Sequence, residues 1–123
     1  MDENLKQSIR QWASSVHFRI RIYFYGSRLK GTAKQDSDFD LAIEFLDPWI
    51  NRTLTWMDYH DKWESRLYKI TNSRMHLELY DNENVHVRKY VKDKSIILFE
   101  SPEVPETDDE DFERDLAALL KKD

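Results

Sequence analysis

The stretch "FYGSRLKGTAKQDSDFDLAIEF", residues 24–45, decides the fold of this chain. It contains both glycines of the sequence, Gly26 and Gly31, and it ends in a segment that carries Asp38 and Asp40. At an average usage of roughly 7%, a chain of this length would hold about nine glycines. Two glycines confined to one short stretch therefore indicate a backbone constraint at that place, beside two carboxylates.

Apolar and polar residues alternate on both sides of this turn, in residues 18–25 and 38–45. Such alternation predicts two half-buried strands, each with one apolar and one polar face. Residues two apart on a strand share a face, so the Cα atoms of Asp38 and Asp40 are expected roughly 6.5–7 Å apart on the polar side. A third alternating segment, residues 75–80, places His76, Glu78 and Tyr80 on its polar face.

Helical periodicity appears between the strands. Apolar residues recur at helical spacing over residues 2–15 and 53–70, and tryptophans 12, 56 and 63 are expected in the core. Shorter helices are expected directly after Ser27 and over residues 83–92, and a last strand over 95–100. Trp49 is expected to pack within the loop that follows the second strand. Strands alternating with helices predict an α/β or α+β fold, with helices covering a face of the sheet.

The charge is unevenly distributed along the 123 residues. The net charge is -5, but residues 101–123 contain nine acidic and three basic side chains, so residues 1–100 are close to neutral. A neutral body lacks the basic field that long nucleic acids require, and no such partner is expected. We interpret residues 1–100 as one domain and residues 101–123 as an acidic linker with a short amphipathic segment.

Several classes of protein are disfavoured by composition. The chain has no cysteine, which excludes disulfides, thiolate catalysis and thiolate-bound zinc. The first residues are polar where a secretory signal is apolar, and no apolar run is long enough to span a membrane, so a cytoplasmic protein is expected. The four histidines lack an HxxxH spacing and are expected in structural or surface roles, with His76 sharing the face of Glu78.

The paired carboxylates predict a metal site. Asp38 and Asp40 repel each other unless a cation lies between them, and Mg²⁺ binds carboxylates together with substrate phosphates. Glu78 is the expected third carboxylate, and Asp81 is the alternative. Three carboxylates can hold two metal ions about 3.5–4 Å apart, the arrangement used in phosphoryl transfer.

The glycine turn predicts a phosphate site. A Gly-Ser turn that opens a helix presents backbone N–H groups, a hydroxyl and a positive helix end to an anion. Arg28, Lys30 and Lys34 add positive charge nearby, and of the three Arg28 is the preferred phosphate contact.

Taken together, Gly26-Ser27, a spacer, Ser37 and then Asp38-Phe39-Asp40, with a hydrophobic-Glu-hydrophobic triplet at Glu78, resemble the minimal nucleotidyltransferase domain of the polymerase-beta-like superfamily. The resemblance covers about residues 18–100. It implies a mixed sheet flanked by helices. It also implies that Gly26 and Ser27 contact the β- and γ-phosphates of ATP, with Arg28 and Ser37 assigned to the same nucleotide site. Asp38, Asp40 and Glu78 would be the catalytic, metal-binding carboxylates.

The resemblance further implies an activity and a partner. The enzyme would transfer AMP from ATP, with two Mg²⁺ ions, to an acceptor hydroxyl. Small stand-alone domains of this kind are commonly paired with a HEPN-type ribonuclease toxin, so an antitoxin that modifies a tyrosine of that toxin is expected. Two alternatives stay open: a non-catalytic module that blocks a toxin by contact, and an enzyme acting on a small molecule such as an antibiotic, completed by homo-oligomerisation.

Overall fold

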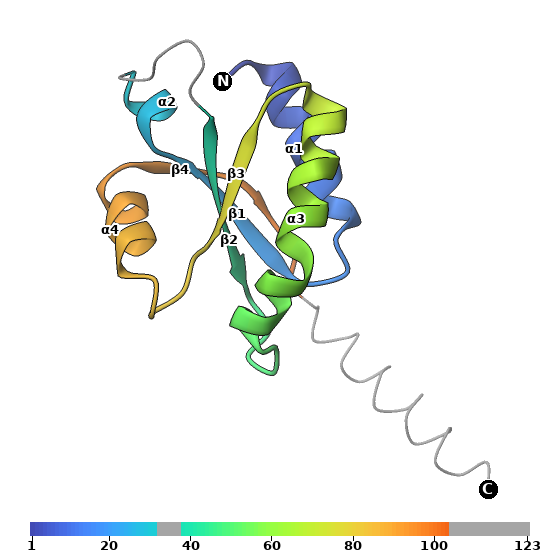
Figure 1. Cartoon of the computed structure of the whole chain (residues 1–123), viewed down its shortest axis with the longest axis vertical. Helices are drawn as coiled ribbons and strands as arrows, with labels where there is room; N and C mark the ends of the chain where they lie inside the picture. The colour runs from blue at the N-terminus through green and yellow to red at the C-terminus, as the bar shows by residue number, and fades with distance from the viewer. Residues whose placement is uncertain (32–37, 104–123) are drawn as a thin grey trace, which may run out of the picture.

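Four helices and four strands alternate along the residues that the structure describes (Figure 1). The computed structural model describes residues 1–31 and 38–103. The elements are α1 (Glu3–Ser15), β1 (Ile20–Tyr25), α2 (Ser27–Lys30), β2 (Phe39–Phe45), α3 (Arg52–Thr71), β3 (Met75–Leu79), α4 (Val85–Asp93) and β4 (Ser95–Glu100). The order expected from the sequence is confirmed.

The strands form one mixed sheet in the order β3-β2-β1-β4. β1 pairs antiparallel with β2 and with β4, and β2 pairs parallel with β3. The parallel pair is joined through α3, because a parallel connection needs a crossover element of a dozen residues or more. This topology confirms the expected mixed α+β sheet.

The apolar face of the sheet is covered by α1 and α3, which lie side by side in Figure 1. Alternate strand residues point into this core, and Ile22, Leu41 and Leu77 are fully buried. Trp12 of α1 and Trp63 of α3 meet edge to face, with ring centroids 6.1 Å apart. Most of the chain's apolar burial, and therefore most of its stability, lies on this side.

Side-chain caps begin the three longer helices. Asp2 accepts from the backbone N–H of Leu5, and Asn51 accepts from that of Leu54. Asn84 caps α4 through Val87 and also donates to the Leu79 carbonyl. These caps satisfy N–H groups that have no partner within a helix.

The opposite face of the sheet is polar and carries only a small apolar cluster. Tyr25 and Ala42 pack there against Val87 and Val91 of α4. Away from α4 this face carries ion pairs between neighbouring strands: Arg21 of β1 lies 2.7 Å from Glu44 of β2 and also pairs with Glu100 of β4. The α4 side therefore has far less buried apolar surface than the α1 and α3 side.

The free edge of β3 is blocked by two side chains of α3. The indole N–H of Trp56 donates to the Leu77 carbonyl at 3.0 Å, and Glu64 accepts from the Leu77 N–H at 3.1 Å. Occupied backbone groups leave no template for another strand at this position.

Some details differ from the sequence-based expectations. Phe18 precedes β1 instead of beginning it, and its ring packs against Phe45 and Tyr59. Trp49 is 75% exposed and does not pack within its loop, because it follows Asp47-Pro48 outside the layer formed by α1 and α3. Trp56 is only partly buried, as its position over the sheet edge requires.

No helix among the described residues combines the length and apolar character needed to cross a bilayer. The expected boundary near residue 101 falls at the end of β4, but the acidic and amphipathic segment from residue 104 onward lies outside the described residues.

Candidate active site

Gly26 lies directly against Asp40. Gly26 has a φ of 89°, a conformation that residues with a Cβ rarely adopt. A Cβ built at this position would lie 2.9 Å from Cγ of Asp40 and closer still to its Oδ2. The register explains the approach, since Tyr25 is the β1 partner of Asp40. The glycine is therefore required both by the turn and by the carboxylate beside it.

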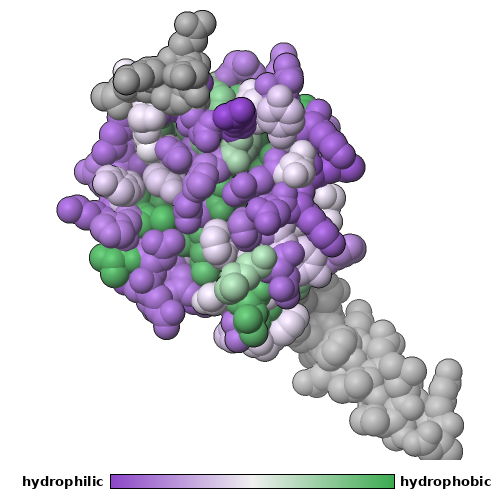
Figure 2. Space-filling model, in the orientation of Figure 1, coloured by the Kyte–Doolittle hydropathy of each residue, from purple (hydrophilic) through white to green (hydrophobic). Residues whose placement is uncertain are grey.

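A cavity of about 580 Å³ opens at this point, between the end of β1 and helix α4. Figure 2 shows a mostly hydrophilic surface on the viewed face, with apolar patches beside α4 and at the start of α3. The lining residues come from β1, α2, β2, β3 and α4 and from the turn and cap positions beside them. They are Tyr25, Gly26, Ser27, Lys30, Asp40, His76, Glu78, Asn84, His86, Val87 and Tyr90. It joins the predicted phosphate turn to two of the predicted carboxylates.

Negative charge accumulates around Asp40. Burial raises the pKa of the Asp40 carboxyl above its ordinary value, and the charges of Asp38 and Glu78 raise it further, while His76 opposes the shift. A cation would relieve this repulsion. Carboxylate oxygens are also the donors that a hard divalent ion prefers.

His76 and Glu78 contact each other on β3. The imidazole Nε2 of His76 meets Oε1 of Glu78, and His76 is also the β2–β3 register partner of Asp40. Burial alone would lower the pKa of His76, but the hydrogen bond with Glu78 and the charges of Glu78, Glu64 and Asp40 raise it overall. His76 thus partly balances the charge of the carboxylates that surround it.

Tyr25 closes the floor of the cavity. It is buried, and burial followed by the charges of Asp40 and Glu78 raises the pKa of its phenol well above the ordinary value. Tyr25 consequently stays protonated and serves as a neutral polar group in the cavity.

The predicted site residues do not all meet in one place. Gly26, Ser27, Asp40 and Glu78 line the cavity together. Asp38 is exposed immediately before β2 and lines a neighbouring hollow of about 380 Å³, which shares His76 with the first.

Two further candidates lie elsewhere. Arg28 stacks over the Phe39 ring at 4.5 Å and does not line the cavity. Asp81 accepts from the Glu83 N–H at 2.6 Å and lines a different hollow, so Glu78 is the carboxylate that faces Asp40. Ser37 and Lys34 lie outside the described residues.

Sequence reasoning missed the contribution of α4. His86 and Tyr90 line the cavity from that helix, and Asn84 lines it from the cap position. Their signal was weak, because the helical pattern over residues 83–92 does not show which face meets the site. Tyr25 had a clearer signal, since it lies on the polar face of β1 next to the glycine turn.

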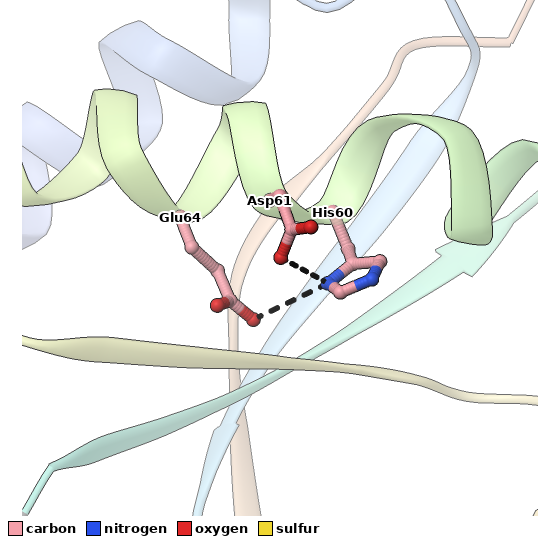
Figure 3. A group of neighbouring side chains, drawn as sticks. All are labelled: His60, Asp61 and Glu64. Carbon is pink, nitrogen blue, oxygen red and sulfur yellow. Dashed lines mark ion pairs between the residues drawn. The ribbon is translucent and has the colours of Figure 1, made fainter.

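A separate group of possible metal ligands lies on α3 (Figure 3). One ligand atom each of His60, Asp61 and Glu64 falls within 4.8 Å of the others. None of them lines the cavity, Asp61 is 88% exposed, and Glu64 is already engaged by the backbone of β3. Glu64 therefore joins α3 to the sheet edge, and the group as a whole lies outside the cavity that holds Asp40 and Glu78.

Comparison with known families identifies the class of this site. The model of the family described as "Polymerase beta, Nucleotidyltransferase" matches residues 7–104. The chain belongs to this nucleotidyltransferase family. The match spans every strand of the sheet and all residues that line the cavity. Among curated proteins, no sequence matches the chain.

Solved structures share the fold of this nucleotidyltransferase. A toxin–antitoxin crystal structure with AMP-PNP has a TM-score of 0.61 and 19% identity, covering 94% of this chain and 86% of that chain. A tri-AMPylated HEPN toxin from Shewanella oneidensis in complex with an MNT antitoxin has a TM-score of 0.56 and 17% identity, covering 98% and 87%. At these identities the likeness shows the fold alone.

Proposed function

We propose that this nucleotidyltransferase transfers AMP from ATP, in a Mg²⁺-dependent reaction, to a tyrosine of a partner HEPN-type ribonuclease toxin, and thereby acts as its antitoxin. The observation that carries the proposal is the single cavity that joins the Gly26–Ser27 turn to Asp40 and Glu78. A triphosphate and its metal ion need both kinds of group within one hollow.

At the α-phosphorus of ATP the reaction forms one P–O bond and breaks another. The acceptor oxygen attacks the α-phosphorus of ATP, the bond from that phosphorus to the oxygen bridging to the β-phosphate breaks, and pyrophosphate leaves. The proton of the acceptor hydroxyl passes to a base, and Glu78 is the residue we assign to this role. We assign the β- and γ-phosphates to Gly26 and Ser27, which line the cavity where the Gly-Ser turn opens helix α2.

Asp38, Asp40 and Glu78 are the residues that would hold the metal. Their oxygen donors fit Mg²⁺. Burial raises the pKa of Asp40, and the charges of Asp38 and Glu78, which the ion would neutralise, raise it further. When bound, Mg²⁺ stabilises the charge on the attacking and leaving oxygens. In the free protein His76 holds Glu78, so Glu78 must exchange this contact for one with the metal or acceptor.

The toxin partner is inferred from two sources. One is the resemblance to minimal nucleotidyltransferase domains described above. The other is that structures of the same fold include a HEPN toxin in complex with an MNT antitoxin and a toxin–antitoxin with AMP-PNP.

Label transfer tests the proposal. The product of the neighbouring reading frame is incubated with the full chain, Mg²⁺ and ATP labelled at the α-phosphate, with γ-labelled ATP as the control. We expect the α-label alone to enter a tyrosine of the partner. Glu78→Gln should lower turnover by about 10²-fold or more while ATP binding is largely kept, because it removes the base but preserves the shape.

The alternatives predict different outcomes. A non-catalytic module would inhibit the partner's ribonuclease activity equally well with Glu78→Gln and would transfer no label. A small-molecule enzyme would leave the partner unlabelled and label a low-molecular-weight acceptor. Equal ATP affinity with and without Mg²⁺ in calorimetry would count against the proposed metal role of Asp38 and Asp40.

A further inference from the structure

Among the described residues that line the cavity, Lys30 is the single lysine or arginine. It ends the short helix α2, one turn after Gly26, and its N–H donates to the Gly26 carbonyl at 3.1 Å. A bound triphosphate carries several negative charges, and the turn itself offers no full positive charge. Within the part of the chain that the structure describes, the cavity therefore presents one permanent cation, beside the Gly26–Ser27 end where the phosphates are proposed to bind.

In the free protein this cation is held by α4. The Lys30 ammonium lies 2.7 Å from Oδ2 of Asp93 and 5.8 Å from the centroid of the Tyr90 ring. Asp93 is the last residue of α4, and its side chain is 61% exposed. The hydrogen bond and charge of Lys30 lower the pKa of the Asp93 carboxyl. Lys30 thus connects the glycine turn with the far end of the α4 wall.

We propose that Lys30 is the phosphate-binding cation of this site and that Asp93 competes with the nucleotide for it. The inference rests on the proposed function, because it names the residue that binds the terminal phosphates of that substrate. A phosphate group offers several charged acceptor oxygens to the ammonium, whereas the exposed carboxylate of Asp93 offers a weak, solvent-screened pair. Binding would move Lys30 from Asp93 to the phosphate.

This competition predicts opposite effects on nucleotide affinity when the charge of Lys30 or that of Asp93 is removed. Removing Lys30 removes a charge-assisted contact from the bound state. Removing Asp93 removes a competitor from the free state, so the nucleotide should bind more tightly. Without Lys30 there is nothing for Asp93 to hold, and its removal should then have no effect on affinity.

A double-mutant cycle tests this arrangement. Binding of Mg²⁺–AMP-PNP to the full chain is measured by calorimetry for the unchanged protein, Lys30→Met, Asp93→Asn and the double variant. We expect Lys30→Met to weaken binding about tenfold or more. We expect Asp93→Asn to tighten it about two- to fivefold, the range of an exposed ion pair, and to have no effect in the Lys30→Met background. Lys92→Met and Asp58→Asn, on exposed positions outside the cavity, are the charge-matched controls.

Each outcome decides the matter. Unchanged affinity in Lys30→Met, or tightening by Asp93→Asn that persists without Lys30, overturns the assignment while leaving the proposed function intact. Equal effects in the control variants reduce the result to net charge and likewise overturn it. Failure of the unchanged protein to bind Mg²⁺–AMP-PNP overturns the proposed function together with the assignment. Circular dichroism spectra that coincide for all variants establish that the differences are not losses of fold.

Discussion

The two faces of β2 differ in what they contribute to the molecule. Leu41, Ile43 and Phe45 are fully buried beneath α1 and α3, whereas Asp40 points to the opposite side, into a cavity walled by the small helix α4. The separation follows from the two-residue period of a strand, which sends neighbouring side chains to opposite faces. One strand can thus hold a stable core and a costly site at adjacent positions. The apolar burial under α1 and α3 offsets the unfavourable free energy of burying Asp40 near other carboxylates on the opposite face.

Removing the carboxylates is the strongest way to test this separation. Asp38→Ala combined with Asp40→Ala should abolish AMP transfer, because the metal loses two of its three proposed ligands. The free energy of unfolding should stay the same or rise, since like charges that repel each other are removed. Transfer assays and denaturant unfolding of the same preparations measure both. Full activity in the double variant would exclude these residues from catalysis.

The neighbouring position on the other face should show the opposite behaviour. Leu41→Ala should lower the free energy of unfolding by about 2–5 kcal/mol, the cost of a cavity in a packed core. Nucleotide affinity should be nearly unchanged at temperatures where the variant is folded. Denaturant titration and calorimetry check the two expectations. A large loss of affinity in folded Leu41→Ala would show that the two faces are coupled.

A smaller effect should appear in the pH dependence of stability. The folded-state pKa of Asp40 is raised above the ordinary value of 3.8, so ionisation of Asp40 opposes folding. Asp40→Asn should therefore be somewhat more stable than the unchanged protein at pH 7. The gain should shrink as the pH falls through the folded pKa and vanish below 3.8, where both side chains are neutral. Thermal unfolding between pH 3 and pH 7 measures it, and a gain independent of pH would contradict the electrostatic explanation.

The sequence predicted the sheet well because the alternation of apolar and polar residues, and the polar face that it defines, are local properties of each strand. Alternation over residues 38–45 and 95–100 predicted β2 and β4 to within one residue, and the polar faces predicted Asp40 and Glu78 on the site side. The helix expected over residues 53–70 agrees with α3 to within one residue at each end.

What the sequence could not predict depends on long-range placement. Arg28 was preferred to Lys30 as the phosphate contact, but in the structure Arg28 stacks over the Phe39 ring and Lys30 lines the cavity. The register that places His76 beside Asp40 follows from how α3 returns the chain to the sheet, which no local pattern specifies. Asp38 shares the predicted face with Asp40 but lies just outside the strand, in a neighbouring hollow.

The contact between Gly26 and Asp40 also constrains how this chain can change over generations. A larger residue at position 26 would displace the carboxylate, so the turn and the strand cannot be altered one at a time without loss. A descendant without Asp40 would be free of the part of this restriction that the carboxylate imposes, but the φ of 89° at the turn would still favour glycine. Gly26 and Asp40 should therefore persist together in descendants that use the site, and loss of the pair would indicate that the site is no longer used.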